Sequence, residues 1–162
     1  MEVDLHSKEW WSSLDPDLQS LFEQSVELTR RVKYWEQHFV DYSFIVFPAA
    51  KAYEGFLKSF FFDMGFITRE QYIGRRFRIG RALNPELEKK YKIKEGVYDK
   101  LSEYCNDPGL SEKLWLTWRE SRNKLFHWFA DEENVVSYPE AKERIEMIID
   151  AIDSVYTACD II

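Results

Sequence analysis

The chain has 162 residues, which is enough for one domain with a core of its own. Its composition is 45% hydrophobic and 17% aromatic, which excludes a disordered chain, and six Gly and five Pro favour long helices over many short strands. The net charge of −7 argues against a protein whose whole surface binds nucleic acid.

Residues 14–37 are predicted to form the first helix, because Asp15 supplies a cap and Pro16 occupies the first helical position. Trp10 and Trp11 precede this helix, and we expect them to anchor the core rather than to contact a partner. The N-terminal residues lack the basic and apolar regions of a signal peptide, so we expect a cytoplasmic protein.

The second helix is predicted to begin between residues 41 and 48 and to end at a Gly65 cap. It is apolar almost all round, as is typical of a central buried helix, but Lys51, Glu54 and Lys58 form one narrow polar stripe. These charges argue against a membrane span. They either face a polar partner on another helix or form a ladder of ion pairs at the surface.

A basic segment follows, in which short helical turns are predicted at residues 69–72 and 75–83, with a break at Asn84 and Pro85. Nine Lys and Arg against three Glu give residues 69–94 a net charge of +6, which leaves −13 for the rest of the chain. This segment could hold RNA, dock an acidic protein or form a solvated loop. The nine basic residues are Arg69, Arg75, Arg76, Arg78, Arg81, Lys89, Lys90, Lys92 and Lys94.

Residues 96–105 are predicted to form a short helix, and a longer helix follows with Ser111 as its N-cap. The last helix begins near Pro139, and its isoleucines recur at helical spacing. Between these two helices, residues 134–138 could form a strand, which is too short to build a sheet. Together the elements predict an all-α fold, a bundle of four to five main helices in a single domain over residues 1–162.

Cys105 and Cys159 have no metal-type spacing. A disulfide between them is one interpretation, but we expect two reduced thiols in a cytosolic protein. His6, His38 and His127 are dispersed along the chain, so neither a metal nor a cofactor is expected. Any chemistry should therefore depend on side chains alone.

Arg122 breaks the pattern of the helix that begins near Ser111. It falls inside the apolar stripe of that helix, although a guanidinium is rarely buried without a partner. Glu54, on the earlier helix, is the expected partner. The stripe consists of Leu114, Trp115, Trp118, Leu125 and Phe129.

His127 lies five residues after Arg122 and on a different face, which it shares with Asn123 at i, i+4. At 3.6 residues per turn, Arg122 and His127 diverge by about 140°. They can serve one site only if the helix is distorted there, if the side chains reach around it, or if a second subunit completes the cleft. A lone histidine at the end of a helix is otherwise a C-terminal cap.

The sequence from Arg122 to His127 resembles the R-x(4–6)-H motif of HEPN domains, in the form with a polar residue directly after the Arg. The segment from Tyr138 to Ala141, which opens an Ile-rich helix, is also similar to HEPN. Residues 41–58 resemble the matching helix of the RNase LS toxins of bacterial toxin–antitoxin systems. These similarities cover residues 40–160, most of the chain.

The resemblance implies an all-α domain that pairs into a homodimer and cleaves RNA without a metal, with the 2′-OH of the substrate as nucleophile. Arg122 and His127 match the motif pair, and Glu54 matches the acidic residue on the earlier helix. An imidazole can transfer protons near neutral pH, and a guanidinium can donate two hydrogen bonds to a phosphoryl group. The candidate RNA-binding residues are Asn123, Lys51, Lys58 and Arg76.

The chain departs from these families in two ways. RNase LS toxins carry extra domains before the HEPN region, for which this chain has no room. Toxins paired with nucleotidyltransferase antitoxins carry a Tyr two residues after the His, where this chain has Phe129. A toxin of this kind would need a protein antitoxin or inhibitor. The rival interpretation is a non-catalytic module that dimerises and binds RNA or a protein, in which Arg122 and His127 are structural.

Overall fold

The computed structural model describes residues 3–105, 107, 109–128, 130 and 135–159. These residues form helices and no strand, so the all-α prediction is confirmed for this part of the chain. The four main helices are α1 (Pro16–Val32), α2 (Ser43–Asp63), α7 (Leu110–Trp118) and α8 (Tyr138–Ala158). The short helices are α3 (Arg69–Ile73), α4 (Ile79–Ala82), α5 (Lys89–Glu95) and α6 (Tyr98–Tyr104), with 3₁₀ turns η1 (Leu5–Ser7) and η2 (Trp11–Ser13) near the N-terminus.

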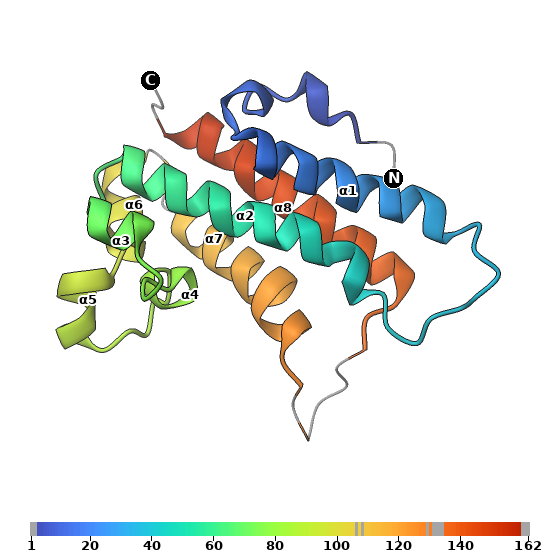
Figure 1. The fold of residues 1–162 in the computed structure, drawn as a ribbon. Helices are drawn as coiled ribbons and strands as arrows, with labels where there is room; N and C mark the ends of the chain where they lie inside the picture. The colour runs from blue at the N-terminus through green and yellow to red at the C-terminus, as the bar shows by residue number, and fades with distance from the viewer. Residues whose placement is uncertain (1–2, 106, 108, 129, 131–134, 160–162) are drawn as a thin grey trace.

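Helix α2 lies at the centre of the bundle. It packs against α1 and α8, and α8 packs in turn against α7, while α3 to α6 gather at one end of these long helices (Figure 1). Buried side chains occur all round α2, as its apolar sequence predicts. None of the helices among the described residues is both long and apolar enough to cross a membrane.

Helix α2 begins at Ser43, within the predicted range of residues 41–48, and Pro48 lies inside the helix. The Asp41 carboxylate accepts hydrogen bonds from the Ser43 amide (2.9 Å) and hydroxyl (2.8 Å) and from the Val136 amide (3.2 Å). These bonds fix the first turn and tie it to the segment before α8. The predicted Gly65 cap is confirmed by a left-handed backbone, with φ at 69°.

Helix α1 is shorter than predicted, since it ends at Val32 instead of continuing to residue 37. The chain beyond it is held by aromatic packing, with the Trp35 and Phe39 rings 6.3 and 5.1 Å from the ring of Phe44. Tertiary contacts between rings therefore override helix propensity in this segment.

The two N-terminal tryptophans are buried, with 1% and 9% of Trp10 and Trp11 exposed, which confirms the expectation that they belong to the core. The Trp10 indole N–H donates to Asp153 Oδ1 at 2.6 Å, and Lys8 Nζ pairs with Oδ2 of the same carboxylate at 2.6 Å. The N-terminal segment is thereby fixed to α8.

Several short elements differ from their predictions. Helix α5 was not expected, and α4 covers only part of the turn predicted at 75–83. The N-cap of α7 is Gly109 rather than Ser111, whose hydroxyl is used to donate to Tyr98 O at 2.9 Å. Residues 135–137 form no strand, and α8 opens with a capping box between Ser137 and Glu140, while Asn134 lies outside the described residues.

The expectation of two reduced thiols is wrong in this structure, because Cys105 and Cys159 form a disulfide. Cys105 ends α6 and Cys159 ends α8, and the packing of α6 on α7 and of α7 on α8 brings their Cα atoms to 4.6 Å. Sequence spacing carried no sign of this proximity, since 54 positions separate the two residues.

Candidate functional site

The helix that carries the motif is distorted at the motif itself. Helix α7 is regular up to Trp118, and a π-helical turn η3 (Arg119–Asn123) and a 3₁₀ turn η4 (Lys124–Phe126) follow it. The Ser121 hydroxyl donates to Thr117 O, the acceptor that the Ser121 amide would use in an α-helix. The Lys124 amide reaches back five residues to Arg119 O. One of the three conditions under which Arg122 and His127 can share a site is therefore present.

Arg122 lies against a carboxylate and an indole. Its Nη2 is 3.6 Å from Oε2 of Glu54, and its guanidinium carbon is 5.2 Å from the centre of the Trp118 ring. Both members of this ion pair are part-exposed, so they border solvent as well as each other. Among the described residues, neither Lys51 nor Lys58 pairs with Glu54, which argues against a surface ion-pair ladder.

Trp118 is buried between Arg122 and the basic segment. A Cβ atom on Gly80 would overlap Nε1 of the Trp118 ring, so α4 approaches the indole closely only because residue 80 is glycine. This contact places α4, which is flanked by exposed arginines in the sequence, beside Trp118 at the end of α7. A single sequence gave no signal for this contact, because it joins residues 38 positions apart.

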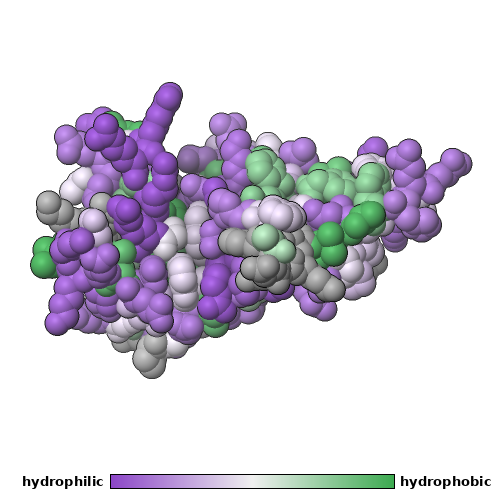
Figure 2. Space-filling model, turned by 90° about the horizontal axis from the view of Figure 1, so that it is seen from below, coloured by the Kyte–Doolittle hydropathy of each residue, from purple (hydrophilic) through white to green (hydrophobic). Residues whose placement is uncertain are grey.

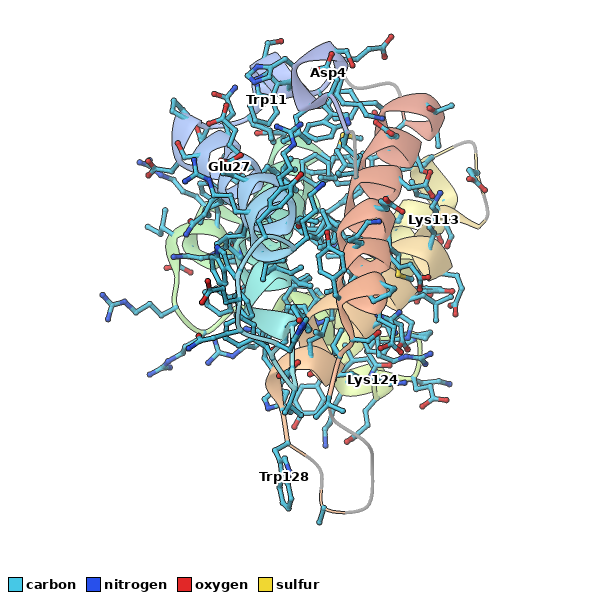
Figure 3. The ribbon with its side chains drawn as sticks, turned by 90° about the vertical axis from the view of Figure 1, so that its right-hand side faces the viewer. Asp4, Trp11, Glu27, Lys113, Lys124 and Trp128 are labelled. Carbon is cyan, nitrogen blue, oxygen red and sulfur yellow. A yellow bond between two sulfur atoms is a disulfide. The ribbon has the colours of Figure 1, made fainter. Side chains whose placement is uncertain are left out.

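His127 ends η4 and has an extended backbone, with φ at −116° and ψ at 139°. Its side chain is exposed, and the Phe126 ring before it packs on Phe47 at 5.2 Å. Trp128 continues the same segment away from the bundle (Figure 3). The structure therefore joins Arg122 to Glu54 and puts His127 on the surface segment that follows them, while Phe129 of the predicted apolar stripe lies outside the described residues.

Glu120 is a charged centre that the sequence analysis did not single out as one. Its carboxylate is 2.9 Å from Arg119, 3.1 Å from Lys124 and 3.9 Å from Arg144 of α8, and 18% of its side chain is exposed. Burial alone would raise the pKa of Glu120, but the hydrogen bonds and charges of Arg119 and Lys124 lower the pKa below its ordinary value. The i, i+4 spacing of Glu120 and Lys124 was the available signal.

The four candidate RNA-binding residues do not share one surface. Asn123 is half-buried in η3. Lys58 Nζ donates to Gly74 O at 3.3 Å, and a depression lined by Gly74 is also lined by the exposed Arg76. Lys51 instead lines a groove of about 660 Å³ between α1 and α2, and Glu54 lines the same groove. Lys58 and Arg76 thus lie near each other, and Lys51 faces α1.

Within the described part of the chain, no three His, Cys, Asp or Glu side chains gather closely enough to hold a metal ion. The chain matches no protein-family model, no curated protein and no solved structure.

Proposed function

We propose that the protein is a metal-independent endoribonuclease of the HEPN type, in which Arg122 and His127 act on the scissile phosphate and Glu54 orients Arg122. The observation that carries this proposal is the π-helical turn, which holds Arg122 against Glu54 and Trp118 directly before the exposed segment of His127. Single π-helical turns within helices occur frequently at functional sites.

The proposed reaction needs three groups. The 2′-oxygen of the substrate attacks the phosphorus as it loses its proton, and the bond from phosphorus to the 5′-oxygen breaks, which leaves a 2′,3′-cyclic phosphate and a 5′-OH. The imidazole of His127 transfers a proton, either from the 2′-OH or to the leaving 5′-oxygen. The guanidinium of Arg122 stabilises the charge that builds on the phosphoryl oxygens. DNA lacks the 2′-OH and is not cleaved by this route.

A homodimer is part of the proposal, and an apolar surface supports it. We define the apolar end face as Trp35, Val40, Phe44, Phe47, Phe126 and Val135. Trp35 stacks on Phe44 and Phe126 packs on Phe47, yet 53% of Phe47 remains exposed. Figure 2, which views the molecule from below, shows a cluster of hydrophobic residues on a surface that is otherwise largely hydrophilic. A second copy seated here would bury this patch beside His127.

RNA binding and the control of the activity are also part of the proposed function. Asn123, Lys58 and Arg76 are proposed to contact the RNA on the side of the basic segment, with Lys51 adding positive field from the α1 side. We expect the activity in the cytoplasm, as a toxin or a defence or stress effector, and we expect a protein antitoxin or inhibitor to restrain it.

The test is RNA cleavage in EDTA by the wild type and by His127→Ala, followed by analysis of the RNA ends. We expect cyclic phosphate and 5′-OH ends from the wild type and a loss of at least about 100-fold in the variant, since proton transfer by a positioned side chain contributes that much. His38→Ala is the matched control, because His38 is also exposed and lies outside the helices. Equal cleavage by wild type and His127→Ala would contradict the proposal.

The apolar end face together with the basic segment also supports a second candidate, a dimeric module that binds RNA without cleaving it. In that case the folded wild type would bind labelled RNA, leave it intact, and lose affinity with rising salt as phosphate contacts are screened.

A further inference from the structure

Trp128 is an exposed aromatic side chain that directly follows His127. It is 79% exposed and points away from the bundle (Figure 3). Tryptophan is highly buried on average, because its large ring gains free energy when it leaves water. Single exposed apolar side chains are nevertheless common on protein surfaces, so the surroundings of this ring decide what it can bind.

The other exposed aromatic side chains are covered in part by neighbours of their own. Lys33, for example, lies over the ring of Tyr34 at 4.8 Å. Among the described residues, Trp128 has no ring or cation beside it and no hydrogen bond. Its ring is therefore open to a molecule outside the chain. The exposed aromatic residues that do have a ring or a cation against them are Tyr34, Trp35, Phe47, Tyr91 and Tyr104.

The segment that carries Trp128 is anchored immediately before it. The Phe126 ring packs edge-on against Phe47 at 5.2 Å, and Leu125 is buried. His127, which comes next, has an extended backbone. Because successive side chains of an extended segment point to opposite sides, the indole does not cover the imidazole. The ring thus lies next to the histidine of the motif without blocking it.

Two cations lie in the turns that lead to this ring. Arg122 of η3 and Lys124 of η4 have 34% and 49% of their side chains exposed, although each pairs with a carboxylate. Sites for single-stranded nucleic acids combine such cations, which contact phosphates, with aromatic rings on which bases stack. Within the described part of the chain, Trp128 makes no ring contact with Phe47 or Phe126 of the apolar end face, so it does not pack into that patch.

We propose that Trp128 stacks on a base next to the scissile phosphate, and that the substrate is RNA with unpaired nucleotides at the cleavage site. This inference rests on the proposed function, which assigns the phosphate to Arg122 and His127. The bases of a duplex are stacked on one another, so an aromatic side chain can stack only on a base that is splayed out. Stacking tolerates any base, because every base has a π face. Trp128 therefore selects unpaired over paired RNA and does not select one sequence.

The affinity for RNA tests this role separately from cleavage. The dissociation constant of a labelled single-stranded RNA is measured by fluorescence anisotropy with His127→Ala, which leaves the RNA intact. Adding Trp128→Ala should weaken binding by about tenfold, because stacking on one base contributes that much. Adding Trp128→Phe, which keeps a ring, should weaken binding by less than about threefold. With a fully paired duplex of the same sequence, Trp128→Ala should leave the affinity unchanged.

Tyr34→Ala is the matched control, because Tyr34 is 78% exposed, lies outside the helices and is not next to His127. In the same His127→Ala chain it should leave RNA binding unchanged, and circular dichroism should show that all variants fold. RNAs that carry one abasic ribose then identify the stacked base. The effect of Trp128→Ala should disappear only when the abasic ribose lies next to the bond that the wild type cleaves, since the phosphate is kept and the base is gone.

The stacking proposal is overturned if Trp128→Ala and Tyr34→Ala bind RNA alike, if Trp128→Ala weakens paired and unpaired RNA equally, or if no abasic position removes its effect. A dimeric wild type and a monomeric Trp128→Ala in sedimentation would also overturn it, because the ring would then contact a second copy of the chain. A wild type that binds RNA through Trp128 and leaves it intact would contradict the nuclease proposal and support the stacking role in a binding module.

Discussion

Trp118 connects two residues that are distant in the sequence. One of its neighbours is the backbone of Gly80, and the other is the guanidinium of Arg122 over the ring. The indole can serve as a platform for Arg122 only while α4 packs directly against it. A change at residue 80 should therefore act on both the stability of the fold and the position of the candidate site.

Gly80→Ala is expected to destabilise the fold by about 1–3 kcal/mol, the usual cost of adding atoms to a filled space. The added methyl would overlap the Trp118 ring, and either α4 or the indole must move. Urea denaturation followed by tryptophan fluorescence measures the change. Gly109→Ala is the control, because its new Cβ would meet only the Asp107 side chain at 3.2 Å. Equal stability losses in the two variants would count against this packing.

For single residues, the sequence predicted the contacts that follow from the spacing of polar and apolar residues along one helix. Arg122 inside an apolar stripe required a partner, and Glu54 was identified as that partner because it interrupts an apolar helix. Gly80 gave no comparable signal, since its importance lies in a neighbour that only the fold supplies. The ion pairs of Glu120 with Arg119 and Lys124 were visible as spacing, but the contact with Arg144 depends on the packing of α7 on α8.

At the scale of elements, the π-helical turn is the feature that shapes the site. The Ser121 hydroxyl of η3 donates a hydrogen bond to Thr117 O. The Glu120 carboxylate of the same turn forms ion pairs with Lys124 and with Arg144 of α8. The widened turn is thus held by a hydrogen bond and by a small group of charges. Protonation of Glu120 would remove its part of this support.

The pKa of Glu120 is lowered in the folded state, so its contribution to stability is complete above the ordinary carboxyl value of 4.5 and is lost as the pH falls through the lowered value. Glu120→Gln should reduce the free energy of unfolding by roughly 1 kcal/mol at pH 7, because the group is part-exposed. The difference from wild type should shrink on acidification below pH 4.5.

Denaturation curves at pH 7 and at successively lower pH measure this difference. Glu146→Gln is the control, since Glu146 is an exposed carboxylate of α8 with no ion pair among the described residues. A constant gap between wild type and Glu120→Gln at every pH would show that the loss comes from packing and not from charge.

Elements with long local patterns were predicted best. Helix α8 has isoleucines at helical spacing and a capping box, and its start agrees with the sequence within one residue. Helices α4 and α5 are shorter and depend on contacts between segments, such as the bond from the Val97 amide to Ala82 O at 2.8 Å. A sequence pattern of four to seven residues cannot predict hydrogen bonds between distant segments, which explains why α5 was not predicted.

At the scale of the whole molecule, the disulfide joins the ends of α6 and α8 and closes a long loop around α7. Cys159→Ser is expected to lower the free energy of unfolding by about 4 kcal/mol, the chain-entropy value for a loop of 54 residues. Chemical denaturation with and without dithiothreitol measures it. Reductant should destabilise the wild type and leave Cys159→Ser unchanged, and insensitivity of the wild type to reductant would contradict the bond.

The N-terminal segment is held in place by a residue that is synthesised near the end of translation. Trp10 and Lys8 both bind Asp153, which lies 143 and 145 positions later in the chain. A ribosome therefore releases the first aromatic anchor of the core long before it synthesises the acceptor, and until then this indole has no carboxylate to bind. Contacts of such high sequence separation form slowly. The segment translated first should accordingly be among the last to reach its native position.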